Sequence, residues 1–227
     1  MNEKICTVAI DGPSGAGKST IARRAAEIFG FIYVDTGAIY RTVGLAARRA
    51  GIDPKAAERV EPLLPQLNIE LRHGDDGAQH MFLNGEDVSG FIRTPEISMY
   101  ASAVSAIPFV RAYLMDMQRN MAKTMSVIMD GRDIGTVVLP DAGLKIFLTA
   151  SSEARAKRRL LELEQKGEKV SFEEVLRDMI ERDRNDSTRA AAPLKQAEDA
   201  LLVDTTELDL DQSIEAVCKL IRERFGL

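Results

Sequence analysis

The sequence of 227 residues predicts an α/β fold in which strands alternate with helices around a mainly parallel sheet. Three observations predict this fold. Short apolar runs without polar alternation recur along the chain, which is typical of strands buried on both faces. Segments with helical periodicity separate these runs. A glycine-rich loop joins the first run to the first helical segment. The length permits one large domain with smaller insertions.

The first βα unit lies at the start of the chain. Residues 5–10 are β-branched and apolar, and they predict a strand. Residues 12–17 break this pattern with glycines. From residue 18 to residue 29, apolar side chains return at helical spacing.

A second βα unit follows directly. Residues 31–34 predict another short strand. Thr36 is expected to be the N-cap of a helix that runs to about Arg49, and Gly51 is expected to stop it.

Three further strands complete a predicted parallel sheet of five, over residues 127–129, 144–148 and 201–203. Helices flank them. One is expected over residues 152–165, and another opens at a capping box at residues 171–174 and runs toward Arg184. A last helix is expected over residues 213–225.

One region departs from this α/β rhythm. Leu67, Ile69 and Leu71 alternate with polar residues, a turn is expected at residues 73–77, and apolar residues resume at 81–83. A further short strand is expected after Asn84-Gly85. This pattern predicts a small antiparallel β insert.

Composition narrows the class of protein. The 30 Lys and Arg residues against 35 Asp and Glu give a net charge of −5, which disfavours a nucleic-acid-binding surface. Cys6 and Cys218 lie far apart and outside any CxxC pair, so we expect buried small side chains rather than a disulfide or zinc site. The sequence has no signal-peptide core and no apolar run of about 18 residues. We therefore expect a cytoplasmic protein without a membrane or nucleic-acid partner.

The glycine-rich loop reads Gly-Pro-Ser-Gly-Ala-Gly-Lys-Ser from residue 12 and matches GxxxxGK[ST] in full. Its position between a strand and a helix aims backbone N–H groups and a helix N-terminus at a phosphate chain. Lys18 is expected to reach the β and γ phosphates, and the Ser19 hydroxyl to bind Mg²⁺. The loop therefore predicts a P-loop core that binds a nucleoside triphosphate. The expected nucleotide-binding residues are Gly12, Pro13, Ser14, Gly15, Ala16, Gly17, Lys18, Ser19 and Thr20.

Arginines outside the loop indicate a second anion. No NKxD tetrapeptide, the guanine-reading motif of regulatory GTPases, occurs. Arg41 lies in the first turns of the second helix, and Arg132 follows directly on a predicted strand. Arg182 and Arg189 lie near the end of a helix, with Asp183 and Asp186 between them. In open α/β sheets, ligands bind at the carboxyl ends of strands, so we expect these residues to border the site.

The sequence resembles the bacterial cytidylate kinases, which are P-loop nucleoside monophosphate kinases. The resemblance extends from residue 10 to about residue 194, in family order. Its most specific parts are Gly-Glu-Asp-Val-Ser-Gly from residue 85 and Asp-Gly-Arg-Asp from residue 130, followed by Gly-Thr-Val. The other matching segments are residues 10–18, 35–41, 92–94 and 189–194.

The resemblance implies one P-loop kinase domain of three parts. The core would comprise residues 1–62, 95–150 and 195–227, with an NMP-binding β insert at about 63–94 and a helical lid at about 151–190. It also implies a monomer. The lid arginines Arg155, Arg158 and Arg159 match a basic stretch of the family, and one of them is expected to contact ATP, with Arg158 as the candidate.

The resemblance further implies a role for each of these site residues. Arg41, Arg132 and Arg189 would hold the acceptor's α-phosphate, Arg182 and Asp186 would face its ribose, and Ser102, Arg111 and Asp133 would read its base. Thr36 and Tyr40 complete the expected substrate-binding set. The expected catalytic residues are Lys18, Asp130, Arg132 and Arg189, with Asp130 able to orient magnesium through water.

The activity that this resemblance implies is transfer of the γ-phosphoryl group of MgATP to CMP or dCMP, which gives CDP or dCDP and ADP. The acceptor phosphate is mostly dianionic at neutral pH, so it needs no general base. Two alternatives stay open at this point. One is a kinase for another small acceptor, such as dTMP, AMP or shikimate. The other is an ATP-binding switch without catalytic activity.

Overall fold

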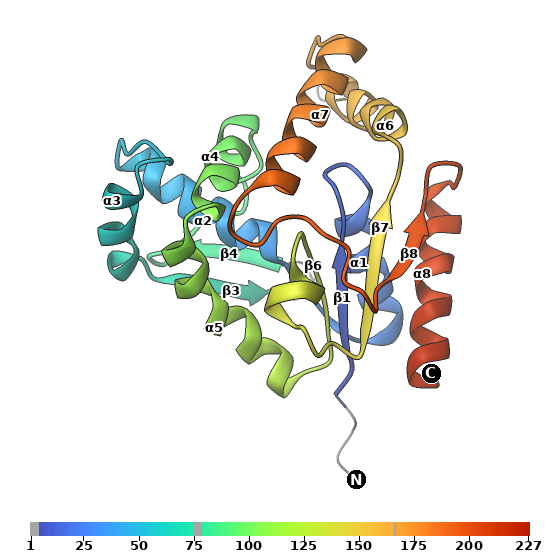
Figure 1. The fold of residues 1–227 in the computed structure, drawn as a ribbon. Coiled ribbons are helices and arrows are strands. Elements are labelled where there is room, and N and C mark those ends of the chain that lie inside the picture. Colours follow the sequence, from blue (N-terminus) through green and yellow to red (C-terminus); the bar gives the residue numbers. More distant parts are fainter. Residues whose placement is uncertain (1–4, 75–78, 166) are drawn as a thin grey trace. The chain divides into compact units, whose positions relative to one another are not determined.

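A computed structural model describes residues 5–74, 79–165 and 167–227 of the chain (Figure 1). Within them a five-stranded sheet has the order β2-β6-β1-β7-β8. The pairings of β6 with β1, β1 with β7 and β7 with β8 are parallel. The predicted five-stranded parallel sheet is confirmed. Its strands are β1 (Thr7–Asp11), β2 (Ile32–Asp35), β6 (Val127–Gly131), β7 (Leu144–Thr149) and β8 (Leu201–Asp204).

The chain divides into two compact units. Unit 1 comprises Met1–Ile32 and Met125–Leu227, and unit 2 comprises Tyr33–Thr124. The predicted β insert at about residues 63–94 belongs to unit 2. The predicted limits of core, insert and lid stay a prediction.

The core of unit 1 explains why its strands are apolar without alternation. The central residues of β1 and β6 have no exposed surface, so both faces of these strands are covered. They are Val8, Ala9, Ile10, Val127, Ile128 and Met129. Cys6 and Cys218 are buried free thiols, as the sequence predicts.

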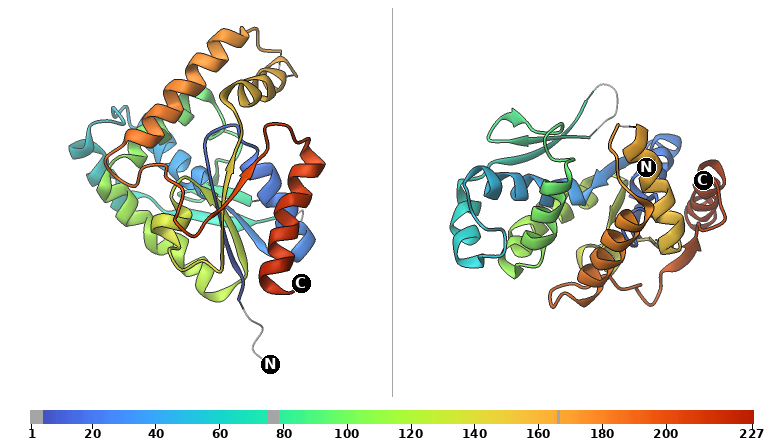
Figure 2. Two further views of the ribbon diagram at one scale, coloured as in Figure 1. Left: turned by 45° about the vertical axis from the view of Figure 1, so that its right-hand side comes forward. Right: turned by 90° about the horizontal axis from the view of Figure 1, so that it is seen from above.

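The helices of unit 1 flank the sheet. They are α1 (Lys18–Phe29), the π-helical turn η2 (Ile134–Val138), α6 (Ser152–Gln165), α7 (Phe172–Thr188) and α8 (Leu210–Phe225). Helix α1 packs against α8 and against β1 and β6. Helices α6 and α7 pack against each other, as both views of Figure 2 show. Ala156, Leu163, Val175 and Met179 form their small shared core.

Two helix ends in unit 1 test the predicted caps. Ser171 and Glu174 form the expected capping box, although α7 continues beyond Arg184 to Thr188. The expected start of the last helix at residue 213 is wrong by one turn. The helix begins three residues earlier, at Leu210, and Asp209 caps it. The Asp209 side chain accepts a hydrogen bond from the Gln212 backbone N–H, and the Gln212 side chain accepts one from the Asp209 backbone N–H.

Unit 2 contains the antiparallel insert. Its sheet has the order β3-β4-β5, with Ile69 opposite Leu83 and His73 opposite Gln79. The predicted hairpin is therefore confirmed, although residues 75–77 of its expected turn lie outside the described part of the chain. The elements are α2 (Thr36–Arg49), α3 (Ala57–Val60), the 3₁₀ turn η1 (Glu61–Gln66), β3 (Ile69–His73), β4 (Gln79–Leu83), β5 (Glu86–Asp87), α4 (Pro95–Ser105) and α5 (Pro108–Thr124).

The expected cap of α2 is wrong by one residue. Asp35, rather than Thr36, accepts the hydrogen bond from the Ala38 backbone N–H, and Thr36 is the first helical residue. An aspartate is as good an N-cap as a threonine, and here it also stands at the end of β2. At the other end, Gly51 has a φ of +64°, as a stop signal requires.

Helices α4 and α5 are absent from the sequence-based assignment. The signal for α4 was present, because Thr94 caps it and Pro95 and Glu96 open it. In the described chain no one helix is long and apolar enough to cross a membrane, and α4 and α5 meet that test only as a pair bent by 98°. Their apolar residues Ile97, Val104 and Leu114 are buried in the core of unit 2.

Candidate functional site

Backbone geometry at the P-loop explains its glycines. Gly12 has a φ of +149°, and a Cβ there would lie 1.9 Å from the carbonyl oxygen of Leu148 on β7. Gly15 and Gly17 also have positive φ angles, and Gly17 is the residue from which α1 begins. No side chain caps this N-terminus, so its N–H groups remain available to an anion. These backbone angles explain why the loop has glycine at these three positions.

Lys18 is buried, although it carries a charge. Its side chain is in the first turn of α1, and its Nζ donates a 2.7 Å hydrogen bond to the carbonyl of Pro13. Burial, together with the nearby positive charge of Arg132, lowers the pKa of Lys18 to about 7, against the opposing effect of Asp130 and Asp11. A buried lysine beside an arginine is stabilised when an anion joins them.

The expected magnesium site contains two suitable oxygens. The Ser19 hydroxyl donates a 2.9 Å hydrogen bond to Oδ2 of Asp130, which lies near the end of β6. Mg²⁺ prefers such hard oxygen ligands and commonly completes its shell with water and substrate phosphates. Across the described ranges no group of three or more His, Cys, Asp or Glu side chains is arranged to hold a metal.

Asp11 joins the P-loop to the loop after β6. It directly precedes Gly12, and its two carboxylate oxygens accept 2.7 Å hydrogen bonds from the backbone N–H groups of Ile134 and Gly135. Burial raises the pKa of Asp11 to about 6, while these two hydrogen bonds lower it. Sequence reasoning missed this residue, and its position just before the glycine loop was the available signal.

Two of the acid–arginine pairs in unit 1 join predicted site residues to each other. Arg132 Nε contacts Oδ2 of Asp186 at 2.7 Å, and Arg189 Nη2 contacts Oδ1 of Asp133 at 3.4 Å. These pairs join the loop after β6 to the C-terminal end of α7, more than 50 residues along the chain. The structure therefore brings together four of the predicted substrate-binding residues.

Charge around Asp186 is mostly positive. Burial alone would raise the pKa of Asp186, but the charge and hydrogen bond of Arg132 hold it below its usual value. Arg182 and Arg189 act in the same direction. Arg182 also lowers the pKa of Lys18, so the predicted ribose-facing and P-loop residues lie within electrostatic reach of each other.

Arg155 connects the P-loop to both helices of the expected lid. This buried side chain donates to the carbonyl of Ser14 at 2.9 Å and to Oδ2 of Asp183 on α7 at 2.6 Å, and its Nε donates to the carbonyl of Ala150. Neighbouring Arg158 instead donates to Thr205 and to the carbonyl of Leu208. Its predicted contact with ATP stays a prediction.

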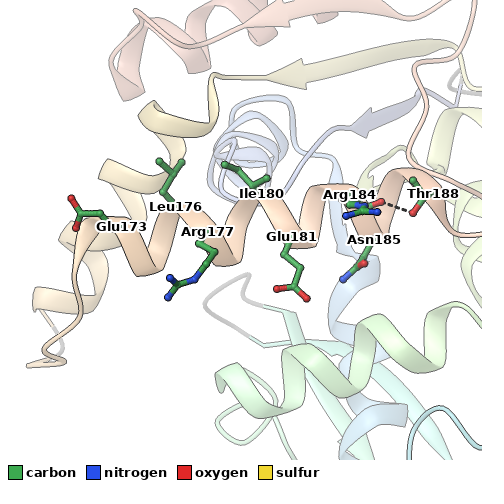
Figure 3. A pocket seen from close by; sticks show the side chains of 8 residues that line it. All are labelled: Glu173, Leu176, Arg177, Ile180, Glu181, Arg184, Asn185 and Thr188. Carbon is green, nitrogen blue, oxygen red and sulfur yellow. Dashed lines mark hydrogen bonds between the residues drawn. The ribbon is translucent and has the colours of Figure 1, made fainter.

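Two hollows lie on unit 1. One of about 470 Å³ lies at the start of α6 and the loop after β8, with Ala154, Arg158 and Leu208 in its wall. A larger one of about 750 Å³ follows α7, where Leu176 and Ile180 project from one side of the helix and Arg177 and Glu181 from another (Figure 3). The larger hollow contains none of the predicted site residues. The smaller one has the predicted residue Arg158 in its wall and is therefore the better candidate for part of a nucleotide site.

The remaining predicted residues lie in unit 2. Thr36 and Tyr40 are buried on α2, and Arg41 Nη2 contacts Oδ2 of Asp35 at 2.7 Å. The Arg111 guanidinium lies 5.6 Å from the centre of the Tyr40 ring and donates to the carbonyl of Ser105. Ser102 lies on the same helix as Ser105, and the Ser105 hydroxyl donates a hydrogen bond to the Ser102 carbonyl. Unit 2 thus brings Tyr40 and Arg111 into contact.

The five-stranded parallel sheet, the glycine loop between β1 and α1 and the small antiparallel sheet together define a P-loop kinase fold. The family model described as cytidylate kinase matches residues 8–223. The chain belongs to the cytidylate kinase family.

Curated relatives extend over nearly the full length. A cytidylate kinase from Thermosipho melanesiensis is 49% identical, over 98% of this chain and 99% of that protein. One from Caldicellulosiruptor bescii is 51% identical, over 96% of each. Among solved structures, an uncharacterized protein from Eubacterium ventriosum shares the fold with a TM-score of 0.54 at 13% identity, covering 97% of this chain and 100% of that one.

Proposed function

We propose that this protein is a nucleoside monophosphate kinase that transfers the γ-phosphoryl group of MgATP to CMP or dCMP. The products are ADP and CDP or dCDP. Membership of the cytidylate kinase family supports the acceptor, and the P-loop supports the donor.

One observation carries the chemistry. Lys18, Arg132 and Arg182 lie close enough for the arginines to lower the lysine's pKa, and Lys18 and Arg132 are largely shielded from water. Like charges repel strongly under such shielding, so this arrangement favours binding of a polyanion. Two phosphorylated substrates meeting in line supply the negative charge that these residues would neutralise.

On the donor side, the P-loop N–H groups and Lys18 would hold the ATP phosphates. The Ser19 hydroxyl and the Asp130 carboxylate would hold Mg²⁺, directly or through water, and the ion would supply positive charge beside the phosphates. The hollow beside Arg158 is the candidate place for the donor base. The residues that we assign to the donor are those predicted from the sequence, Gly12 to Thr20 together with Arg158.

On the acceptor side, Arg132, Arg189 and Arg41 would bind the α-phosphate. Guanidinium forks match phosphate oxygens with paired hydrogen bonds. Arg132 and Arg189 are already oriented by Asp186 and Asp133, so binding would exchange or share these carboxylate partners. Asp186 and Arg182 would then be near the ribose hydroxyls, and Thr36 and Tyr40 would contribute from α2.

The preference for cytosine would come from a carboxylate. Asp133 can accept a hydrogen bond from the exocyclic amine of cytosine, with Ser102 and Arg111 as further contacts. Uracil presents an acceptor at that position, and a desolvated carboxylate without a donor costs about 1–3 kcal/mol. CMP should therefore be preferred over UMP by about 5- to 150-fold.

The proposed reaction needs no protein base. An oxygen of the acceptor's phosphate forms a bond to the γ-phosphorus, while the bond from that phosphorus to the β–γ bridging oxygen breaks and ADP leaves with the electron pair. The acceptor is already mostly dianionic near pH 7. Arg132, Arg189 and Lys18 would stabilise the charge that spreads over the transferred group. We assign α6 and α7 to a lid whose closure excludes water from the donor.

We also propose that the protein acts as a monomer in the cytoplasm, without nucleic-acid or membrane partners. Every residue assigned to the reaction comes from this one chain, and both substrates are cytoplasmic metabolites. Light scattering behind a sizing column, with and without both nucleotides, tests the monomer. A dimer under turnover conditions would contradict it.

A panel of acceptors tests the proposed function. ADP formation with MgATP should be fastest with CMP and dCMP, slower with UMP, and slight with AMP, dTMP and shikimate. Faster turnover with any of the last three would overturn the assignment. Nucleotide binding without acceptor-dependent turnover would indicate an ATP-binding switch instead.

A further inference from the structure

The first residue of β4 holds the backbone of another element in unit 2. The amide oxygen Oε1 of Gln79 accepts a 2.7 Å hydrogen bond from the backbone N–H of Asp35. Its Nε2 donates to the carbonyl oxygen of the same residue at 3.3 Å. Both halves of the Gln79 amide therefore bind one peptide segment, the end of β2. A side chain with only a donor or only an acceptor cannot form both bonds.

Asp35 passes this constraint on to Arg41. Its carboxylate is nearly buried, with Oδ1 accepting the capping hydrogen bond from Ala38 N–H at 2.9 Å and Oδ2 accepting from Arg41 Nη2 at 2.7 Å. Both oxygens are thus committed, and the Arg41 side chain follows the position of Asp35. Gly37 leaves room for this pair, because a Cβ there would lie 3.0 Å from Arg41 Nη1.

A second contact ties the same hairpin to β2. His73, opposite Gln79 in the β3–β4 register, places its Nε2 3.0 Å from the carbonyl oxygen of Tyr33. Two side chains from one register pair thus fix the last residues of β2. Asp35 is the carboxylate that orients the Arg41 guanidinium, through its contact with Nη2. In the described part of the chain the Nε of the same guanidinium is buried without a hydrogen-bond partner.

We propose that Gln79 is a positioning residue for the acceptor phosphate, acting through Asp35 on Arg41. The inference rests on the proposed role of Arg41 in CMP binding. This proposal gives the β insert a specific role. Its hairpin holds the backbone of Asp35, and the Asp35 carboxylate orients Arg41. Networks of this kind lose more than one hydrogen bond when a member is removed, because each bond fixes the geometry of the next.

The test compares Gln79→Ala with a matched control, His80→Ala, in steady-state kinetics. His80 is the next residue in β4 and contacts Asp87 rather than Asp35. Gln79→Ala should raise the KM for CMP about 3- to 10-fold, the effect of one or two lost hydrogen bonds, and leave the KM for ATP within about twofold. His80→Ala should leave both unchanged. Gln79→Glu, which keeps the acceptor but places a carboxylate oxygen against the Asp35 carbonyl oxygen, should also raise the KM for CMP.

A double-mutant cycle separates positioning from a general structural role. In an Arg41→Ala background, Gln79→Ala should have almost no further effect on the KM for CMP, because the residue it positions is gone. A full, additive loss there would overturn the proposal, and so would normal CMP kinetics of Gln79→Ala or of Arg41→Ala. If Gln79→Ala fails to fold by circular dichroism, the same cycle with Gln79→Glu decides.

Failure of the inference and failure of the proposed function have different signatures. If wild-type protein forms no CDP from CMP and ATP, the proposed function is wrong. If wild-type protein is active and Gln79→Ala equals it, the function stands and the positioning role is wrong.

Discussion

Charged side chains in unit 1 are arranged in pairs that restrain each other. Arg132 is paired with Asp186, and Arg189 with Asp133, while Lys18 lies beside Arg132 and Asp130. Each cation thus has a carboxylate neighbour and is largely shielded from solvent. This is a suitable starting state for neutralising two phosphate chains.

Lys18→Ala tests the P-loop at the level of one residue. The change removes the cation expected on the β and γ phosphates, so ADP formation should fall by about 100-fold or more. The melting temperature should change little, because a buried charge with a lowered pKa contributes little to stability. Near-normal turnover would contradict the assignment of this loop.

Asp133→Asn tests the reading of the base. The variant amide keeps the size of the side chain but loses the charge that accepts from the cytosine amine. We expect a larger rise in the KM for CMP than in that for ATP, and a CMP/UMP preference reduced by about 5-fold or more. Equal rises in the KM values for CMP and ATP would indicate that Asp133 serves only to pair with Arg189.

Asp186 gives a prediction about pH. Its pKa in the folded protein is lower than its ordinary value of 3.8, because Arg132 outweighs the effect of burial. The folded state therefore binds fewer protons than the unfolded state, so this group stabilises the fold above about pH 4 and loses that effect as pH falls through its folded pKa. The stability difference between wild type and Asp186→Asn, from urea unfolding, should be larger at pH 7 than at pH 3. A difference that does not shrink in acid would contradict this pairing.

At the scale of elements, the P-loop is the most constrained turn of unit 1. Gly12→Ala would place a Cβ 1.9 Å from the Leu148 carbonyl oxygen, so the loop or β7 must move. We expect a loss of more than about 3 kcal/mol in unfolding free energy, together with loss of ATP binding.

Gly30→Ala is its matched control. Gly30 also has a positive φ, of +66°, but a Cβ there meets nothing within 4 Å. Its cost should be about 1–2 kcal/mol, from backbone conformation alone, with ATP binding retained. Thermal unfolding and ATP titration of both variants distinguish steric conflict from simple strain, and equal effects would contradict the close approach of Gly12 to β7.

The sequence predicts those elements whose signals are local. The strands of unit 1 are buried on both faces, so their apolar runs are easily recognised in the sequence. Helix α7 begins with a capping box, which is also recognisable from the sequence. Helices α4 and α5 were not predicted, although the start of α4 carries a local capping signal at Thr94. Helix α4 packs on α2 at Gly44, where a Cβ would lie 3.0 Å from the backbone of Ala101, and this contact is visible only in three dimensions.

The site shows the same division. P-loop residues and the Asp-Gly-Arg-Asp segment were predicted because their chemistry lies in contiguous motifs. Asp11 and Gln79 were missed, since each binds the backbone of a segment more than 40 residues away. Arg155 was named only as one of three lid arginines, and its bond to the backbone of Ser14 was not predicted. Backbone atoms carry no sequence signature, so no motif reports such partners.

For the whole molecule, net charge turns out to be a poor guide to its ligands. The chain carries −5 overall, which argues against a nucleic-acid surface, yet Lys18, Arg132 and Arg189 are gathered in one unit. A few aimed cations suffice for small polyanions, whereas a nucleic acid requires an extended basic surface.

Phosphoryl transfer itself is the central claim, and ³¹P NMR of a mixture of the protein, MgATP and CMP tests it directly. The account predicts that the ATP β-phosphate signal declines as β-phosphate signals of both ADP and CDP grow in equal amounts. Growth of inorganic phosphate with unchanged CMP, or an unchanged spectrum, would contradict it.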